Sequence, residues 1–264
     1  MERFRFVTTP FTREIRIDHR HKVAHIEEEI LALKAAIDSR QSAVLTAPAG
    51  SGKTLVLRTL KSLLPESRYK TTYFKLTDVS ARDMCRQIAA ALGTEPAGNF
   101  PSLVRAIEER LRAGFEDGGL RQIIMIDDAQ ELRPEAMKLI RLLTNFDMDS
   151  KLVVSIILSG QLLLKEILHR PEMEDVKQRL IRSSELRLLT RDETKSYIGH
   201  RVKLAGAQHS PFEDGASDAI YEITRGNMRA IDKIATACLV EADKAARDGV
   251  SPADVTSARA KLWM

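Results

Sequence analysis

The eight residues from Ala47 to Thr54 constrain this chain more than any other segment. They read Ala-Pro-Ala-Gly-Ser-Gly-Lys-Thr. This fits the phosphate-binding pattern Gly-x-x-x-x-Gly-Lys-[Ser/Thr] at each fixed position except the first, where Ala47 replaces glycine. Glycines let backbone N–H groups approach phosphate oxygens without a Cβ in the way. The first position opens the loop, so we expect alanine to be tolerated there. The segment predicts a loop between a strand and a helix that binds nucleotide phosphates.

Each polar residue of the loop has an expected task. Lys53 supplies a mobile positive charge for the β- and γ-phosphates of ATP, and Thr54 supplies a hydroxyl for Mg²⁺. The N-terminus of the helix that follows adds its dipole. We therefore expect ATP to contact one continuous run of residues: Ala49, Gly50, Ser51, Gly52, Lys53, Thr54 and Leu55.

A second segment, 123–128, is an apolar run that ends in two acids. Such a strand places Asp127 beside the phosphate loop, where we expect it to share Mg²⁺ with Thr54. We expect Asp128 to be the catalytic base that activates the attacking water. Glutamate is commoner at this position. The shorter side chain of Asp128 therefore either brings the water closer or slows turnover.

Strands and helices are expected to alternate through the first two thirds of the chain. Strands are expected at 42–46, 71–76, 123–126, 152–159 and 184–188, of which 123–126 and 152–159 contain the most apolar stretches. Helical spacing and start or stop signals predict helices at 21–39, 54–64, 83–92, 102–115, 134–145 and 162–169. This alternation predicts an α/β fold of the P-loop NTPase type, an αβα sandwich around a parallel sheet.

From about residue 189 the pattern changes to helices alone. Thr190 and Glu193 form a capping box, and Ser251 with Asp254 opens the last helix in a similar way. We therefore place a domain boundary near 188. Residues 1–188, including an irregular lead-in, form the expected ATP-binding core, and 189–264 form a small all-helical lid.

Composition limits the classes of function that remain. The chain has 264 residues and a net charge of +4. Residues 189–264 carry 11 Lys/Arg and 11 Asp/Glu, which leaves 30 against 26 for residues 1–188, so the surplus lies in the core. A mild surplus permits a nucleic-acid partner without requiring one. No leader and no apolar run near the ~18 residues of a membrane span occur, which favours a cytoplasmic protein without a membrane partner. Cys85 and Cys238 lack metal-ligand spacing, and we expect reduced thiols.

Several further polar residues are candidates on weaker signals. Ser159 or Gln161, just past the fourth strand, is placed to sense the γ-phosphate. Arg179 and Arg182 lie before the last strand, where an arginine reaches the nucleotide of a neighbouring subunit. Arg229 begins a lid helix and is placed to swing onto the γ-phosphate. Each of these residues also fits an ordinary loop or surface position.

Taken together, these residues resemble the AAA+ ATPases and, within them, the ExeA-like branch. The resemblance spans nearly the whole chain and rests on the phosphate loop and on several further stretches. These are Thr9-Pro10-Phe11, Ile126-Asp127-Asp128-Ala129-Gln130, Arg141 to Ser150, Leu158-Ser159-Gly160-Gln161, Gln178-Arg179-Leu180 and Gly226-Asn227-Met228-Arg229. The departures are Ala47, Asp128 for glutamate, and Ser159 before Gly160.

The resemblance implies an ATP-dependent homo-oligomer, a ring or a helical filament, with nucleotide at the subunit interfaces. Arg179 would complete the neighbour's catalytic site, and Arg229 and Ser159 would read the γ-phosphate. The compact chain and its basic core are similar to the transposon regulators of the MuB, TnsC and IstB type. Such proteins assemble on double-stranded DNA, select the target site and recruit a transposase. The residues expected to face the DNA channel are Lys75, Thr77, Arg82 and Thr94.

Two other readings stay open. The branch also includes secretion-associated ATPases, which act on a protein assembly and not on DNA. Those proteins continue into a membrane span and a peptidoglycan-binding part, whereas we expect this chain to end after its lid. The third reading is a nucleotide switch without turnover, in which Asp128 is too short to drive hydrolysis.

Overall fold

The computed structural model describes residues 3–75, 78–95, 98–147 and 150–262. Contacts divide these residues into two units. The sheet unit consists of His25–Ala47 and Lys53–Leu186, and the helical unit consists of the chain up to Ala24, the loop Pro48–Gly52 and the chain from Arg187 onward. Each unit is described by itself.

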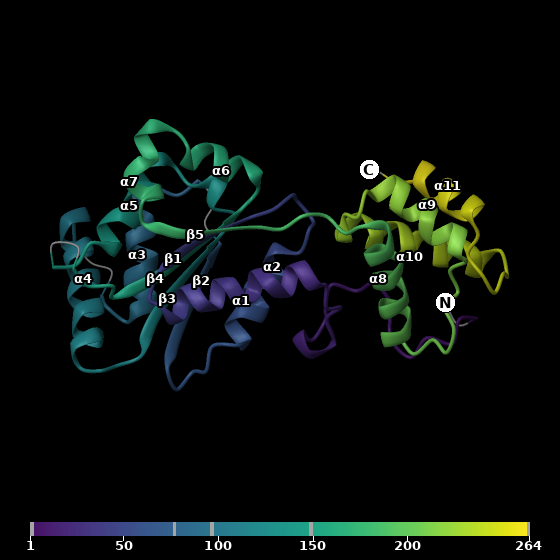
Figure 1. Ribbon diagram of the computed structural model, residues 1–264, viewed down its shortest axis with the longest axis horizontal. Coiled ribbons are helices and arrows are strands. Elements are labelled where there is room, and N and C mark those ends of the chain that lie inside the picture. Colours follow the sequence, from purple (N-terminus) through teal and green to yellow (C-terminus); the bar gives the residue numbers. More distant parts are fainter. Residues whose placement is uncertain (1–2, 76–77, 96–97, 148–149, 263–264) are drawn as a thin grey trace. The chain divides into compact units, whose positions relative to one another are not determined.

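The sheet unit is built on a five-stranded parallel sheet with the order β2-β3-β4-β1-β5 (Figure 1). The strands are β1 (Ser42–Thr46), β2 (Tyr69–Lys75), β3 (Arg121–Asp127), β4 (Val154–Gly160) and β5 (Leu180–Glu185). All residues of β1 and β4 are buried, as expected for central strands covered on both faces. Because all strands are parallel, their carboxyl ends meet at one edge of the sheet and their amino ends at the other.

Helices of the sheet unit supply the apolar cover. They are α1 (Ala24–Asp38), α2 (Lys53–Ser62), α3 (Ala81–Leu92), α4 (Phe100–Glu116), α5 (Pro134–Thr144), α6 (Leu162–Leu168) and α7 (Glu174–Lys177), with the short 3₁₀ helices η2 (Ala129–Glu131) and η3 (Pro171–Met173). One buried cluster joins α3, α4 and α5 to Ile124 and Ile126 of β3 and to Ile156 and Leu158 of β4. The alternate residues of these strands are buried as well. The predicted αβα arrangement with a parallel sheet is confirmed.

The elements differ from the predicted ranges by a few residues, and β5 differs most. We expected this strand at 184–188, but it begins at Leu180 and ends at Glu185. Arg182 therefore lies inside the strand and not before it. β5 is an edge strand, and Ile181 and Arg182 are exposed, so its sequence shows no apolar run by which to place it.

The helical unit contains α8 (Arg191–Leu204), α9 (Asp214–Thr224), α10 (Met228–Lys244), α11 (Pro252–Ala260) and the 3₁₀ helix η1 (Ile17–His19). Both predicted capping boxes are present, at Thr190 with Glu193 and at Ser251 with Asp254. None of the helices in the described residues is long and apolar enough to cross a membrane.

The lead-in groups with this unit, whereas the sequence analysis placed it in the core. The backbone N–H of Val7 donates to Ala205 O at 2.8 Å, and an Nη of Arg201 donates to Thr12 O at 2.6 Å. The ring of Phe11 meets that of Phe212 edge to face, with centroids 6.0 Å apart. The boundary near 188 stays a prediction; the contacts divide the chain between Leu186 and Arg187.

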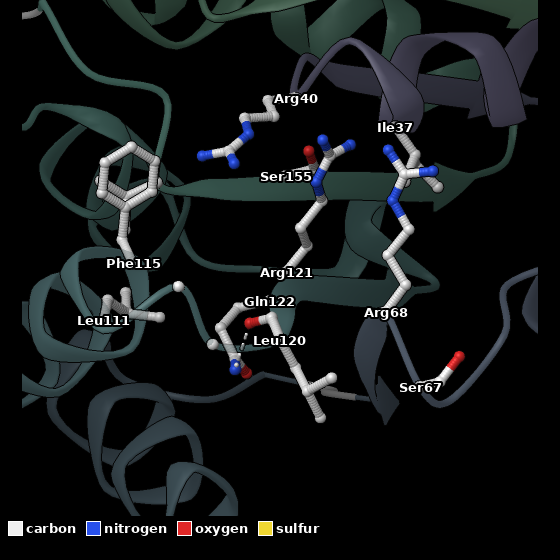
Figure 2. Close-up of a pocket in the computed structure, with 13 residues that line it drawn as sticks. Ile37, Arg40, Ser67, Arg68, Leu111, Phe115, Leu120, Arg121, Gln122 and Ser155 are labelled. Carbon is white, nitrogen blue, oxygen red and sulfur yellow. Dashed lines mark hydrogen bonds between the residues drawn. The ribbon is translucent and has the colours of Figure 1, made fainter.

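The amino-terminal edge of the sheet holds a cavity of about 350 Å³ (Figure 2). Residues from the end of α1, the starts of β2 and β3, and the end of α4 line it. Three of these are arginines: Arg40, Arg68 and Arg121. Within the sheet unit, the cavity lies at the opposite edge of the sheet from Asp127, the last residue of β3.

A buried polar cluster in the helical unit makes stability depend on pH. The Asp232 carboxylate accepts a 2.9 Å hydrogen bond from the Tyr197 hydroxyl and lies 3.5 Å from Arg201. Burial raises the pKa of Asp232 from 3.8 to about 6, although Arg201 and Tyr197 act to lower it. The stabilisation from this raised pKa is complete when the pH is below the pKa of Asp232 in the unfolded state. It is lost as the pH rises through about 6, the pKa in the folded state.

We therefore expect the free energy of unfolding to fall between pH 4 and pH 7 by on the order of 2 kcal/mol relative to Asp232→Asn, which has no such group. Urea unfolding of both proteins across this range measures the difference. Asp248→Asn, at an exposed acid of the same unit, is the control and should follow the wild type. Parallel pH profiles for wild type and Asp232→Asn would contradict the assignment.

Candidate functional site

The glycine loop has the backbone that its sequence predicts. Gly50 and Gly52 have φ of 81° and 98°, in the left-handed region that side chains disfavour. Within the helical unit, the backbone of Ala49 accepts a 2.6 Å hydrogen bond from the Asn227 side chain, and Gly50 O accepts from Arg229 N at 3.2 Å. A Cβ on Gly50 would lie 2.3 Å from Asn227 Oδ1, so glycine is needed there for space as well as for φ.

The helix after the loop begins at Lys53, as the pattern requires, and Leu55 follows in its first turn. Lys53 is buried, and its Nζ donates to Ala47 O at 3.3 Å. A buried ammonium is costly unless it has partners. The first turn of the helix also leaves backbone N–H groups without intrahelical acceptors, which suits an anion.

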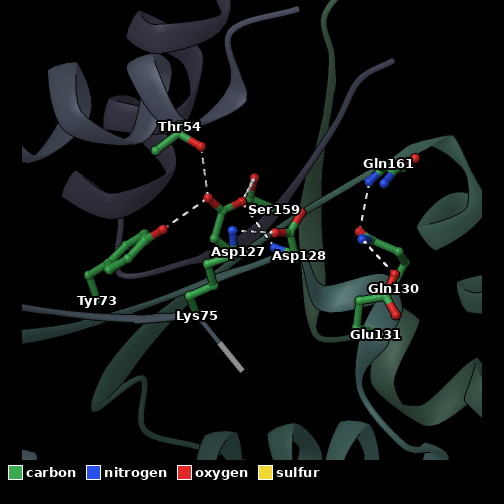
Figure 3. Close-up of polar contacts among 9 residues, drawn as sticks. All are labelled: Thr54, Tyr73, Lys75, Asp127, Asp128, Gln130, Glu131, Ser159 and Gln161. Carbon is green, nitrogen blue, oxygen red and sulfur yellow. Dashed lines mark hydrogen bonds and ion pairs between the residues drawn. The ribbon is translucent and has the colours of Figure 1, made fainter. Parts of the chain in front are cut away.

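Asp127, the last residue of β3, is the centre of a hydrogen-bond network (Figure 3). Its Oδ2 accepts from the Thr54 hydroxyl and from the Tyr73 hydroxyl, each at 3.0 Å. Its Oδ1 accepts from the Ser159 hydroxyl at 2.9 Å and from the backbone N–H of Asp128 at 3.0 Å. These donors come from α2, β2, β4 and the residue that follows β3. Together they fix the orientation of a carboxylate that is 2% exposed.

This oxygen set fits a magnesium ion. Mg²⁺ prefers hard oxygen ligands and is usually held by one or two protein groups plus substrate phosphates. The Thr54 hydroxyl donates a hydrogen bond to Asp127, which leaves the lone pairs of the hydroxyl oxygen for a cation. The sequence analysis predicted this pair of ligands, and the structure brings the two side chains together. Ser159, which was predicted to sense the γ-phosphate, donates a hydrogen bond to the Asp127 carboxylate in the structure.

Asp128 directly follows β3 and has a left-handed backbone conformation, with φ of 52°. Aspartate is one of the residues that tolerate this region. One of its oxygens lies 3.1 Å from Nζ of Lys75, the last residue of β2. Lys75 was predicted to contact DNA, and in the structure it pairs with the predicted catalytic base.

Two other predicted DNA contacts, Arg82 and Thr94, also have partners within the protein. A guanidinium nitrogen of Arg82 donates to Gly98 O at 3.1 Å, and the Thr94 hydroxyl donates to Ala89 O at 2.9 Å at the end of α3. Thr77 lies outside the described residues. Arg82 is exposed and remains available to solvent on its other nitrogens.

The two arginines near β5 have different surroundings. Arg182, within the strand, forms an ion pair with Glu29 of α1 at 3.1 Å. This pair ties β5 to α1, so Arg182 is engaged within its own unit. Arg179 lies between α7 and β5, and its role toward a neighbouring subunit stays a prediction.

Two residues of the site were missed or left without a role. Tyr73 was predicted only as one position of the strand at 71–76. Burial and the Asp127 charge raise the pKa of its hydroxyl, so the phenol keeps the proton that it donates. Gln130 accepts from the Gln161 backbone at 2.8 Å and links η2 to the turn after β4. The sequence signal that could have identified Tyr73 was a side chain with a hydroxyl group near the end of the strand predicted at 71–76.

Comparison with known proteins agrees with this geometry. Residues 36–168, about half of the chain, match the family model described as an AAA domain. General secretion pathway protein A of Aeromonas hydrophila is 28% identical over 201 residues, which is 75% of this chain. The chain spans 36% of the length of that relative.

Solved structures share the fold. Cdc6p from Pyrobaculum aerophilum superposes with a TM-score of 0.75 at 19% identity, over 96% of this chain and 70% of that one. The ORC1 protein of Aeropyrum pernix in complex with DNA gives 0.68 at 18% identity, over 92% and 66%. The RuvB Holliday junction branch migration motor of Thermotoga maritima gives 0.62 at 18% identity, over 96% and 73%. At these identities the likeness shows the fold alone.

The contact of Gly50 with Asn227 predicts a large effect of a small substitution. Gly50→Ala forces a non-glycine residue into a left-handed φ and drives its Cβ into Asn227. We expect the free energy of unfolding to fall by about 1–2 kcal/mol. The matched control is Gly199→Ala in α8, where a Cβ meets nothing within 4 Å and should stabilise the helix by up to about 1 kcal/mol. Chemical denaturation measures both, and equal changes would refute the contact.

Proposed function

This chain belongs to the AAA domain family, and we propose that it is an ATP-dependent regulator of DNA transposition. In this proposal it oligomerises on double-stranded DNA, selects the target site and recruits a transposase. The Asp127 network carries the nucleotide-binding part of the proposal, because it joins the two predicted magnesium ligands. The DNA part rests on the charge surplus and on the motifs, and it is tested below.

The residues of the sheet unit divide the work of hydrolysis. A bound Mg²⁺ ion would neutralise charge on the phosphates. Thr54 and Asp127 would hold that ion, with Tyr73 and Ser159 keeping the carboxylate in place. Lys53 would stabilise negative charge as it develops on the transferred phosphoryl group. Asp128 would take the proton of the attacking water.

The assignments at the subunit boundary remain part of the proposal. Arg179 would reach the nucleotide of a neighbouring subunit in a homo-oligomer, either a ring or a filament. Arg229, whose backbone contacts Gly50, would read the γ-phosphate. Hydrolysis would then act as a timer that releases the oligomer from DNA. A cytoplasmic location fits this role.

The proposal that the protein binds DNA is supported by its surplus of basic residues and by the exposure of several of them. The surplus of basic residues lies within 1–188. Lys75, Arg82 and Arg86 are exposed at the end of β2 and on α3. Exposed lysines and arginines grip the phosphate backbone without reading bases, so we expect strong dependence on salt and little on sequence. One of the structures that share the fold is a complex with DNA, and another is a branch migration motor.

The match to general secretion pathway protein A favours a second candidate. In that alternative the chain is an ATPase that acts on a protein assembly of a secretion pathway and ignores DNA. Both candidates use the same nucleotide site. Binding to duplex DNA therefore separates them.

Duplex DNA binding by fluorescence anisotropy tests the transposition proposal. With a slowly hydrolysed ATP analogue we expect binding that weakens steeply with salt, by about one log unit per log unit of salt for each phosphate neutralised. With ADP, or with Lys53→Ala protein, we expect affinity to fall at least about tenfold, since the oligomer no longer assembles.

The control is Lys61→Ala, which removes the same charge from an exposed position on α2. It should retain binding. Absence of binding at low salt with every nucleotide would reject the DNA proposal and leave the secretion-type ATPase as the better account.

The role of Asp128 has a separate test. Asp128→Asn should retain ATP binding and lower phosphate release by about 100-fold or more, because amide nitrogen and oxygen are poor bases. Asp128→Glu, which restores the commoner length, should release phosphate at least as fast as the wild type. Glu135→Gln, at an acid in the first turn of α5, is the control. Unchanged turnover in Asp128→Asn would remove Asp128 from the mechanism.

A further inference from the structure

The cavity at the amino-terminal edge of the sheet is separate from the nucleotide site. Arg121, which lines it, begins β3, and Asp127 ends the same strand. The six residue-to-residue steps of strand from Arg121 to Asp127 span about 20 Å. The cavity volume of about 350 Å³ is within the range of sites for small molecules.

Three arginines dominate the lining. Arg40 follows α1, Arg68 precedes β2 and Arg121 begins β3. Figure 2 shows Arg68 and Arg121 extending in the same direction, and both guanidinium groups lie within 6 Å of the Tyr69 ring centroid, at 5.5 and 5.9 Å. The Arg40 guanidinium lies 4.6 Å from the centroid of Phe115. Planar guanidinium groups held against aromatic rings are well ordered for binding an anion.

The charge of this cluster is only partly balanced among the described residues, because the nearby Asp38 carboxylate interacts with Arg68. No acidic residue is among the described residues that line the cavity, and none of the three arginines forms an ion pair in the described part of the chain. The nearby Asp38 carboxylate accepts from Lys34 at 2.6 Å and from Tyr69 at 2.5 Å. Burial and repulsion from Arg121 and Arg68 lower the pKa of Arg40. An anion would relieve this repulsion.

Structural roles use little of the donor capacity of these arginines. Arg121 donates one bond, from Nη1 to Asp38 O at 2.9 Å, at the end of α1. A guanidinium group carries five N–H donors. The Arg68 and Arg40 side chains contact the rings of Tyr69 and Phe115 and donate no hydrogen bond to another described residue, so their N–H groups can bind other acceptors.

The backbone at Arg40 adds a second observation. Arg40 has φ of 60° and stands at the left-handed position that ends α1, where its N–H donates to Ile37 O and that of Gln41 donates to Ala36 O. Glycine is the usual residue here because it carries no penalty. Arginine costs about 1 kcal/mol at this position. A side-chain function would offset that cost.

The other residues that line the cavity indicate which chemical groups a ligand would carry besides its anionic group. The Gln122 side chain donates to Leu120 O at 3.0 Å, while its Oε1 is buried without a hydrogen-bond partner. The Leu120 carbonyl fixes which end of the amide is the oxygen. Leu111, Val153 and Ile37 supply buried apolar surface. The set suits a compact ligand with an anionic end, a hydroxyl or amine donor, and some carbon surface.

We propose that this cavity binds the phosphate group of a small phosphorylated molecule, held by Arg40, Arg68 and Arg121, with Gln122 accepting from a ligand hydroxyl. A sugar phosphate is the ligand class that meets these requirements. The site does not depend on the transposition proposal, because it lies at the opposite edge of the sheet from Asp127.

The test uses full-length protein carrying ¹⁵N-labelled arginine and follows the side-chain Nε–H signals by nuclear magnetic resonance. The probes are ribose 5-phosphate, inorganic phosphate and ribose. We expect saturable shifts at the three cavity arginines with ribose 5-phosphate, weaker ones with inorganic phosphate, and none with ribose. Arg105, exposed on α4 outside the cavity, is the internal control and should not shift. Because each arginine gives its own signal, phosphate that binds at the glycine loop is not mistaken for binding in the cavity.

Two variants separate binding from folding. Arg40→Gly removes a guanidinium and relieves the left-handed backbone, so the protein should unfold no more readily than the wild type while binding ribose 5-phosphate at least about tenfold more weakly. Arg68→Gln removes an exposed side chain without hydrogen bonds to described residues and should weaken binding similarly.

Three results would overturn the proposal. One is the absence of saturable shifts at the cavity arginines, and another is an affinity for ribose 5-phosphate that neither variant changes relative to the protein without these substitutions. The third is a response to duplex DNA with none to the phosphates, which would make the arginines a contact for the DNA backbone. The titration is done without ATP on the Lys53→Ala protein. Failure of the DNA proposal and failure of this one are therefore distinguishable.

Discussion

The buried Asp127 carboxylate is the constraint on which the sheet unit depends. A charge at 2% exposure is tolerable because four donors converge on it. The donors come from separate elements, so the carboxylate fixes the start of α2 and the ends of β2 and β4 relative to β3. Residues far apart in the sequence thereby form one site. The same network brings together Asp127 and Thr54, the two predicted magnesium ligands.

The glycine loop shows how closely backbone and site are linked. Its conformation is set by positive φ at Gly50 and by contact with Asn227. The motif therefore demands glycine for two reasons. A Cβ would obstruct phosphate oxygens, and it would collide with the start of α10. The Asn227 side chain satisfies both the Ala49 carbonyl and, through Oδ1, the backbone N–H of Ala230.

Sequence reasoning succeeded where local patterns carry the information. The loop, the apolar β3 run and both capping boxes depend on neighbouring residues, so they were predictable. Tyr73 was missed because its partner, Asp127, lies on another strand. The sequences of β2 and β3 do not show that these two strands are neighbours in the sheet. The misplaced β5 has the same origin, since an exposed edge strand lacks apolar alternation. Lys75 was predicted only as a DNA contact, because its distance to Asp128 depends on the pairing of β2 with β3.

The two edges of the sheet bind anions by different physics. At the carboxyl edge, helices begin, and their backbone N–H groups and dipoles favour phosphate before any side chain is added. At the amino edge, helices end, and the carbonyl groups of α1 repel an anion. Arg121 offsets part of that field by donating to Asp38 O. Any anion held there must therefore be held by side-chain charge alone, which is why three arginines gather at that edge without a carboxylate among the cavity residues described.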